Sequence, residues 1–127
     1  HIDSLDLYGR GSSNPIDRKE DALSDYRYSI AIENCSQENY FTEKLLDCFS
    51  VGTIPVYFGC PNIEDYFDPE GVITFSCREE FLDLLPKLTE DTYNKKIDSV
   101  KSNFIKFKDY AITEDWLYYN VLKDYDK

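Results

Sequence analysis

Histidine is nearly absent from this 127-residue sequence, and its single copy, His1, stands at the first position. A terminal residue is a poor place for a general base, so Ser-His-Asp and Cys-His catalysis are disfavoured. No Walker A motif is present, which argues against the P-loop class of nucleotide hydrolases. The sequence also lacks an apolar run of about 20 residues, the length of a membrane-spanning helix.

Methionine is missing altogether, and because the sequence opens on His1 we expect a processed chain or a fragment. No signal-peptide pattern is visible. Basic residues are few, since 14 Lys and Arg stand against 25 Asp and Glu, and the formal net charge is -11. That excess of negative charge argues against non-specific binding to nucleic acid or to an anionic membrane.

Cysteine occurs four times, but the spacing is wide and no C-x-x-C pair exists, so a structural zinc site is not expected. Cys35 and Cys60 both stand at the ends of predicted strands. A disulfide between them stays open as an alternative, and we favour free thiols in a reducing compartment. Asp124 and Asp126 form an Asp-x-Asp pair near the C-terminus, which we interpret as a solvated tail rather than a metal site.

Large apolar side chains are plentiful: 42% of the residues are hydrophobic and 16% are aromatic. We therefore expect a single domain with its own core over residues 1–127. Strand-like and helix-like patterns alternate in the first half, which predicts an α/β fold with a parallel sheet and helices on both faces. Pro55 lies inside a predicted strand and indicates an edge position or a bulge. The predicted strands are residues 4–9, 26–33, 53–58 and 72–75, and the predicted helices are 42–50, one capped by Ser76, one opening at 89–92 and one opening at 113–115.

One stretch, residues 33–44, joins a predicted strand to a predicted helix and carries the main candidate site. Open α/β sheets bind ligands at the carboxyl ends of their strands, and a helix start offers unpaired N–H groups that suit a phosphate. Thr42 or Asn39 is expected to cap the helix. Lys44 places a positive charge in a first turn that disfavours one, which points to a nearby anion.

Further side chains of the stretch suit a sugar nucleotide. Glu43 can accept hydrogen bonds from sugar hydroxyls, and Tyr40 offers a ring and a hydroxyl. Glu33 and Glu43 form a pair of carboxylates near one edge of the sheet, and the alternative for Glu33 is a hydrogen bond to loop N–H groups. Loops rich in Asn, Ser and Glu are also common as simple helix caps, and the residues alone favour that ordinary interpretation.

Other positions border the same region. Gly52 follows the predicted helix and is expected to end it in a left-handed conformation. Gly59 and Asn62 follow the next strand, which places them on the same rim as Lys44. Arg10 lies in a Gly-x-Gly segment that matches a dinucleotide fingerprint only weakly, so a flexible turn is the preferred interpretation.

Several motifs occur in order along the chain: Lys19 with Leu23, then residues 26–34, 40–45, 52–59 and 61–63. Together they resemble the donor-binding half of the α-1,3-fucosyltransferase family, also called glycosyltransferase family 10. The resemblance covers residues 5–67 well and the helical tail only loosely. It implies a two-lobed GT-B fold with two facing Rossmann-like domains, of which the second binds GDP-fucose.

In that family transfer inverts the anomeric configuration, and neither a metal nor another cofactor is strictly required to hold the donor. The motif positions imply donor contacts from Asn34, Tyr40, Glu43 and Lys44, with Glu33 lining the same rim. Lys44 would neutralise the negative charge of the diphosphate as GDP leaves the sugar. The family has a similar strand-glycine segment around Arg10, which implies Arg10 as a further rim residue beside Gly59 and Asn62.

The resemblance also implies what this chain does not carry. The general base and the acceptor site belong to the first lobe, so no catalytic base is expected here. We expect a donor domain, part of an enzyme or a reduced relative, that meets a glycan acceptor only through the missing lobe and is inactive in transfer alone. A non-catalytic nucleotide-sugar binding module and an interaction domain that lost the site stay open as alternatives. The expected compartment is the cytoplasm for a bacterial or viral source and the Golgi lumen for a eukaryotic one.

Overall fold

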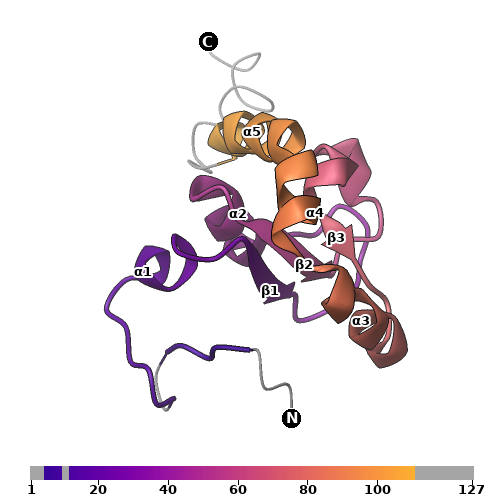
Figure 1. The fold of residues 1–127 in the computed structure, drawn as a ribbon. Coiled ribbons are helices and arrows are strands. Elements are labelled where there is room, and N and C mark those ends of the chain that lie inside the picture. Colours follow the sequence, from indigo (N-terminus) through magenta and orange to yellow (C-terminus); the bar gives the residue numbers. More distant parts are fainter. Residues whose placement is uncertain (1–4, 10–11, 111–127) are drawn as a thin grey trace.

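The structure, a computed structural model, describes residues 5–9 and 12–110. They form a small parallel sheet with helices packed around it (Figure 1). The strands are β1 (Tyr28–Ile32), β2 (Ile54–Phe58) and β3 (Ile73–Thr74). The α-helices are α1 (Lys19–Leu23), α2 (Glu43–Ser50), α3 (Arg78–Leu84), α4 (Glu90–Lys95) and α5 (Ile97–Lys106). Short 3-10 turns cover Ile63–Asp65, Pro69–Gly71, Leu85–Lys87 and Phe107–Asp109.

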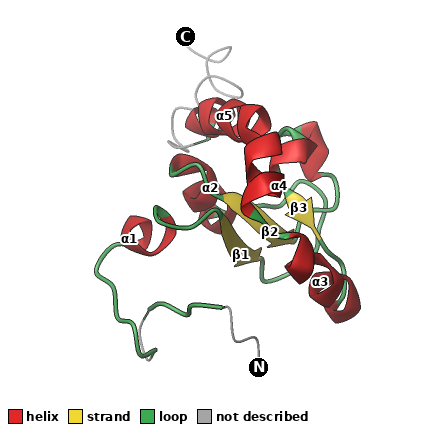
Figure 2. Cartoon of the chain, viewed as in Figure 1, coloured by secondary structure: helices red, strands yellow, loops and turns green. Residues whose placement is uncertain are grey.

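The described strands run parallel in the order β1-β2-β3, so β2 is central (Figure 2). The prediction that Pro55 marks an edge or a bulge is therefore wrong. Ile54 donates its N–H to Arg27 O on the β1 side. Alternate residues of a strand form backbone hydrogen bonds to opposite neighbours, so the backbone nitrogen of Pro55 points to the β3 side. The pairing of β2 with β3 begins only at Val56, one residue later. The missing N–H of Pro55 thus interrupts no ladder bond.

The strand predicted over residues 4–9 does not form in the described part of that segment. Residues 5–9 hold only an isolated bridge between Tyr8 and Asn14. Leu5 and Leu7 are 48% and 67% exposed, so the alternating pattern has no buried face to serve. Alternation predicts a strand only where a neighbouring strand and a core are available to it.

Helix α2 packs on one face of β1 and β2 and supplies much of the core. Thr42 caps it by accepting a hydrogen bond from Lys44 N–H, and Gly52 follows its end with φ of 75°, so both predictions are confirmed. The core cluster consists of Ala31, Leu45, Cys48, Phe49, Tyr57, Cys60, Ile63, Phe67 and Val72. Burial of these side chains fixes the position of α2 against the two strands.

The opposite face of the sheet is partly covered by the segment that leads into α4 and by α3, and Ile32 on this face stays 51% exposed. Tyr28 donates its hydroxyl to Thr89 O at 2.8 Å, and its ring packs edge-on against Tyr93 of α4. Helix α3 joins through ring contacts among Phe58, Phe75 and Phe81. Helices therefore lie on both faces of the sheet, as the sequence predicts.

Helix α5 contacts α2 and the Pro69–Gly71 turn. Its Asn103 is fully buried, accepts Asp68 N–H at 2.8 Å and donates to Asp68 O at 3.0 Å. Ser76 does not cap α3, because Cys77 takes the N-cap position while Ser76 donates to Glu80. All four cysteines are free.

Two sequence predictions fall outside the residues that the structure describes: the helix opening at 113–115 and the Asp124/Asp126 tail. Within residues 5–9 and 12–110, no helix is long and apolar enough to cross a membrane.

Candidate functional site

The candidate site lies where β1 and β2 end side by side. Because the two strands are parallel, the loop after Ile32 and the loop after Phe58 leave the same edge of the sheet. Glu33 N–H donates to Phe58 O at 2.8 Å, and Ser36 Oγ donates to Gly59 O at 2.9 Å. The two loops therefore form one rim, as predicted for Gly59.

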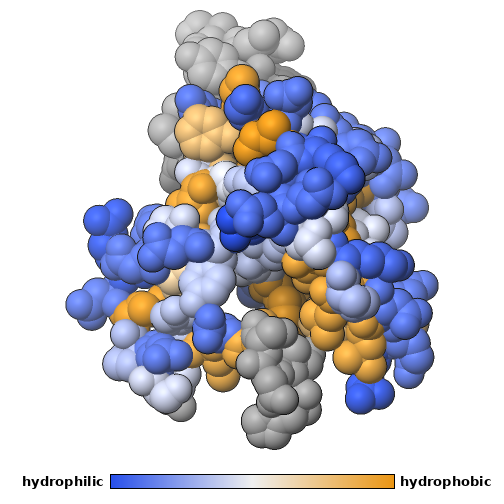
Figure 3. Space-filling model, in the orientation of Figure 1, coloured by the Kyte–Doolittle hydropathy of each residue, from blue (hydrophilic) through white to orange (hydrophobic). Residues whose placement is uncertain are grey.

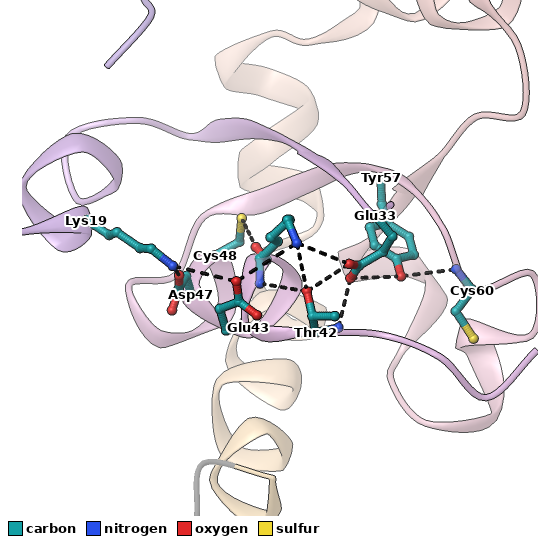
Figure 4. Close-up of polar contacts among 9 residues, drawn as sticks. Lys19, Glu33, Thr42, Glu43, Asp47, Cys48, Tyr57 and Cys60 are labelled. Atoms are coloured by element: carbon teal, nitrogen blue, oxygen red, sulfur yellow. Dashed lines mark hydrogen bonds and ion pairs between the residues drawn. The ribbon is translucent and has the colours of Figure 1, made fainter. Parts of the chain in front are cut away.

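A buried carboxylate lies directly beneath this rim. The side chain of Glu33 is 0% exposed. Its Oε1 accepts Thr42 N–H at 2.8 Å, and its Oε2 accepts the Thr42 hydroxyl at 2.7 Å (Figure 4). Tyr57 Oη lies 3.5 Å from Oε1 and itself accepts Cys60 N–H at 3.1 Å. Glu33 thus lies under the rim rather than on it, bonded to the loop as in the alternative interpretation.

The first turn of α2 does not present the free N–H groups that the sequence predicts for a phosphate. Thr42 N–H donates to Glu33, Lys44 N–H to Thr42 Oγ1 at 3.4 Å, and Leu45 N–H to Thr42 O at 3.2 Å. The Glu43 carboxylate accepts a hydrogen bond from the backbone N–H of the same residue, and this bond is the main cause of the lowered pKa of Glu43. An anion at this helix start must therefore be held chiefly by the Lys44 side chain.

Lys44 sits between carboxylates on one side and open space on the other. Its Nζ is 3.7 Å from Glu33 Oε2, 3.9 Å from Glu43 Oε1 and 3.4 Å from Thr42 Oγ1, and its side chain is 36% exposed. The anion that the sequence predicts beside Lys44 is thus present within the chain. Since an ammonium carries three N–H groups, the exposed side can still reach a ligand.

Lys19 extends this row of charges and was not predicted as a site residue. Its Nζ donates to Asp47 Oδ2 at 2.9 Å, and that hydrogen bond raises the pKa of Lys19. Lys19 Nζ also lies 3.9 Å from Glu43 Oε1. Lys19 belongs to the motifs that carry the family resemblance, but its spacing from residues 33–44 did not indicate this contact, because α1 and α2 meet only in the folded chain.

The two rim loops are also joined by paired asparagines. Asn39 N–H donates to Asn62 Oδ1 at 2.9 Å, and Asn62 Nδ2 donates to Asn39 Oδ1 at 2.9 Å. Tyr66 adds a hydroxyl contact to Asn39 Oδ1 at 2.6 Å. Asn39 has φ of 61°, a left-handed conformation that asparagine tolerates. Asn62 therefore lies on the predicted rim, and Asn39 shapes the loop instead of capping the helix.

The remaining predicted residues lie on the same rim or outside the described chain. Asn34 is exposed and Tyr40 is half-buried, both in the loop between β1 and α2. Arg10 lies outside the residues that the structure describes. Tyr57 was missed as a site residue, and the signal for it was Gly59, whose missing Cβ leaves room for the Tyr57 ring.

A groove of about 930 Å³ runs beside β1 and reaches Lys44. Figure 3 shows apolar side chains around a hollow in the lower half of the view. The volume is in the range of small-molecule sites, and the groove has an apolar wall and a charged end. Its lining includes Lys19, Lys44, Asp47, Ile30, Ile32 and Leu88.

Sequence comparison places the chain among known proteins. The family profile described as "Glycosyltransferase family 10 (fucosyltransferase) C-term" matches residues 1–117. The chain is 37% identical over 73 residues to an "Alpha-(1,4)-fucosyltransferase" of Arabidopsis thaliana, which covers 55% of this chain and 18% of the relative. It is 33% identical over 90 residues to a "GDP-fucose protein O-fucosyltransferase 3" of Xenopus laevis, which covers 68% of this chain and 18% of the relative. The chain thus spans about a fifth of the length of these relatives.

Solved structures agree on the fold. The structure of an "alpha1,3-Fucosyltransferase with GDP-fucose" superposes with a TM-score of 0.64 at 20% identity, covering 91% of this chain and 37% of that one. A second solved structure, described as an "alpha1,3-Fucosyltransferase", superposes with a TM-score of 0.63 at 20% identity. The expected fold class, a parallel α/β domain like the second half of a GT-B enzyme, is therefore confirmed.

Proposed function

The chain belongs to glycosyltransferase family 10, and from that premise we propose that it is the donor-binding domain of an inverting fucosyltransferase-type enzyme that takes GDP-fucose. The observation that carries the proposal is the Lys44 ammonium, anchored on one side and exposed on the other at the charged end of the groove beside β1. A solved structural neighbour with GDP-fucose bound supports this choice of donor.

In this proposal the diphosphate lies against Lys44, and the nucleoside follows the groove along β1. Glu43, exposed and ionised at neutral pH, accepts hydrogen bonds from donor hydroxyls. Asn34 and Tyr40 complete the donor contacts from the loop after β1. The charge of Lys44 would then stabilise the negative charge that develops on the departing GDP.

The chemistry is a single displacement. An acceptor hydroxyl oxygen attacks the anomeric carbon from the face opposite the diphosphate, the new C–O bond forms, and the sugar–phosphate bond breaks with its electron pair on GDP. The hydroxyl proton passes to a general base. We propose that this base and the acceptor site lie outside the present residues, which hold the leaving-group side of the reaction.

Binding is tested by titration calorimetry with GDP, GDP-fucose and UDP. We expect saturable binding of the two guanine ligands and weaker binding of UDP. Lys44→Ala should weaken GDP binding by roughly 10- to 100-fold, the usual range for one charge-assisted contact. Lys101→Ala is the matched control, because Lys101 is an exposed lysine paired with Asp98 on α5. Equal affinities in wild type and Lys44→Ala would overturn the site.

Turnover separates a donor domain from a complete enzyme. We expect no acceptor-dependent release of GDP from GDP-fucose with N-acetyllactosamine-type acceptors. Acceptor-dependent turnover that Lys44→Ala abolishes would show that the acceptor machinery lies within this chain. Binding without turnover is also what a non-catalytic nucleotide-sugar module would give, and joining the chain to the acceptor lobe of a relative distinguishes the two by restoring transfer only for a donor domain.

A further inference from the structure

We propose that Glu33 is a positioning residue: its buried carboxylate, packed against the bare backbone of Gly59, fixes the Thr42 cap and aims the Lys44 ammonium into the groove beside β1. The inference rests on the proposed function only for what Lys44 then contacts. Its structural part, a lysine held in place by a buried carboxylate, can be measured without any ligand.

Glu33 is placed by the sheet itself. It follows the last residue of β1 and continues the ladder through its N–H bond to Phe58 O. Both carboxylate oxygens are engaged by one residue, Thr42, through its N–H and its hydroxyl. A buried carboxylate with two such bonds cannot move without leaving a charge unsatisfied, so the end of β1 fixes the start of α2.

Gly59 shows that this space is reserved for Glu33. A Cβ at Gly59 would lie 2.5 Å from Glu33 Cγ and would also collide with the Tyr57 hydroxyl. Neither neighbour can retreat, because Glu33 is 2% and Tyr57 is 1% exposed. Gly59 has no left-handed φ to account for it, so its missing side chain serves the close approach of β2 to Glu33.

The consequence falls on Lys44. Glu33 Oε2 and Thr42 Oγ1 both lie on the inner side of its ammonium, at 3.7 and 3.4 Å. The ammonium thus hydrogen-bonds Thr42 Oγ1 and pairs with Glu33 on its inner side, while Glu43 Oε1 lies 3.9 Å away and the side chain stays 36% exposed. A flexible four-carbon side chain is thereby ordered before a ligand arrives, which lowers the entropy lost on binding.

Two expectations of opposite sign make the proposal testable. A buried negative charge near a diphosphate repels it, so removing that charge should tighten GDP binding if electrostatics alone decide. If Glu33 orders Lys44, the same change should weaken GDP binding instead. Glu33→Gln tests this directly, because glutamine has the same shape and its carbonyl can still accept Thr42 N–H.

The chain offers a matched control in Glu80. Its Oε2 accepts both the N–H and the hydroxyl of Ser76, each at 2.8 Å. Glu80 therefore binds the N–H and hydroxyl of one residue as Glu33 does, although through one oxygen instead of two. Glu80 is exposed and has no lysine within ion-pair distance among the described residues. Glu80→Gln should therefore leave both Lys44 and GDP affinity unchanged.

The ligand-free readout is the mobility of the Lys44 side chain, followed by ¹³C relaxation at its Cε. We expect Glu33→Gln to raise this mobility to that of Lys101, and Glu33→Asp to do the same although it keeps the charge. Glu80→Gln should change nothing. Lys44 mobility that is equal in wild type, Glu33→Gln and Glu33→Asp would overturn the proposal. Glu33→Asp also serves if Glu33→Gln fails to fold.

The second readout is GDP affinity in a double-mutant cycle. We expect Glu33→Gln to weaken GDP binding roughly fivefold, and to have almost no effect in a Lys44→Ala background, since the two residues act through one contact. The proposal would be overturned if Glu33→Gln bound GDP more tightly than wild type, or if it lost the same GDP affinity in the wild-type and Lys44→Ala backgrounds. If wild type binds no GDP, the proposed function fails, and the Lys44 mobility alone decides the role of Glu33.

Discussion

Gly59→Ala is the substitution for which the structure makes the sharpest stability prediction. The added Cβ would meet Glu33 Cγ at 2.5 Å and Tyr57 Cζ at 2.7 Å, both far inside normal contact distance. Relief requires movement of two buried side chains, and Tyr57→Phe would remove only the hydroxyl part of the conflict. We therefore expect Gly59→Ala to destabilise the fold even in a Tyr57→Phe background.

The magnitude follows from two opposing terms. Overpacking a well-packed core costs about 1–3 kcal/mol. Replacing glycine by alanine also restricts the unfolded chain, which returns about 0.4–1 kcal/mol when the backbone conformation is acceptable. The net expectation for Gly59→Ala is a loss of roughly 1–2 kcal/mol in the free energy of unfolding.

Gly52→Ala is the matched control, because it isolates backbone strain from a clash. Gly52 has φ of 75°, and a Cβ there would meet only Val100 Cγ1 at an ordinary 3.9 Å. We expect a loss of about 1 kcal/mol from the left-handed conformation alone. The two variants should thus be similar in stability and differ in what they disturb.

Urea unfolding gives the free energies, and amide spectra of the labelled variants locate the disturbance. Gly59→Ala should shift the amide signals of Glu33, Thr42 and Lys44, whereas Gly52→Ala should shift signals around Val100 and leave those three in place. Unchanged stability of Gly59→Ala, or unchanged signals at Glu33 and Thr42, would refute the reasoning about this close approach.

Three further predictions concern a buried amide and the cysteine thiols. Asn103→Leu keeps the volume but leaves Asp68 N–H and O without their partners, so urea unfolding should show a loss of about 2–4 kcal/mol. Burial raises the pKa of Cys48 to about 12 from an ordinary 9, so its stabilising contribution is present below pH 9 and is lost as the pH rises toward 12. Between pH 9 and pH 12 the free energy of unfolding should fall less steeply in Cys48→Ala than in wild type. In the native state a thiol reagent should label only the two exposed cysteines, Cys35 and Cys77.

Local signals in the sequence predicted α2 and its surroundings well. Thr42 before an apolar helical pattern and Gly52 after it specify where the helix begins and ends through their own backbone chemistry. The rim position of Asn62 followed from the rule that parallel strands end at one edge. The helix ends depend on short stretches of chain, and the position of Asn62 needs only the parallel pairing of two successive strands, so the sequence alone sufficed.

Features that depend on distant partners were predicted less well. Pro55 looked like an edge residue because the sequence does not show that β3 begins one position further along. The helix start looked open to a phosphate because the sequence offered a bond from Glu33 to loop N–H groups only as an alternative, and does not show that the partner is Thr42 N–H. The segment 5–9 looked like a strand because alternation does not reveal whether a neighbouring strand is available.

Amide shifts of the ¹⁵N-labelled protein during a GDP titration test the central claim most directly. We predict saturable shifts that cluster in residues 34–45, with Lys44 among the largest, and their loss in Lys44→Ala but not in Lys101→Ala. The absence of shifts in residues 34–45 at millimolar GDP would contradict the assignment of this rim as the donor site.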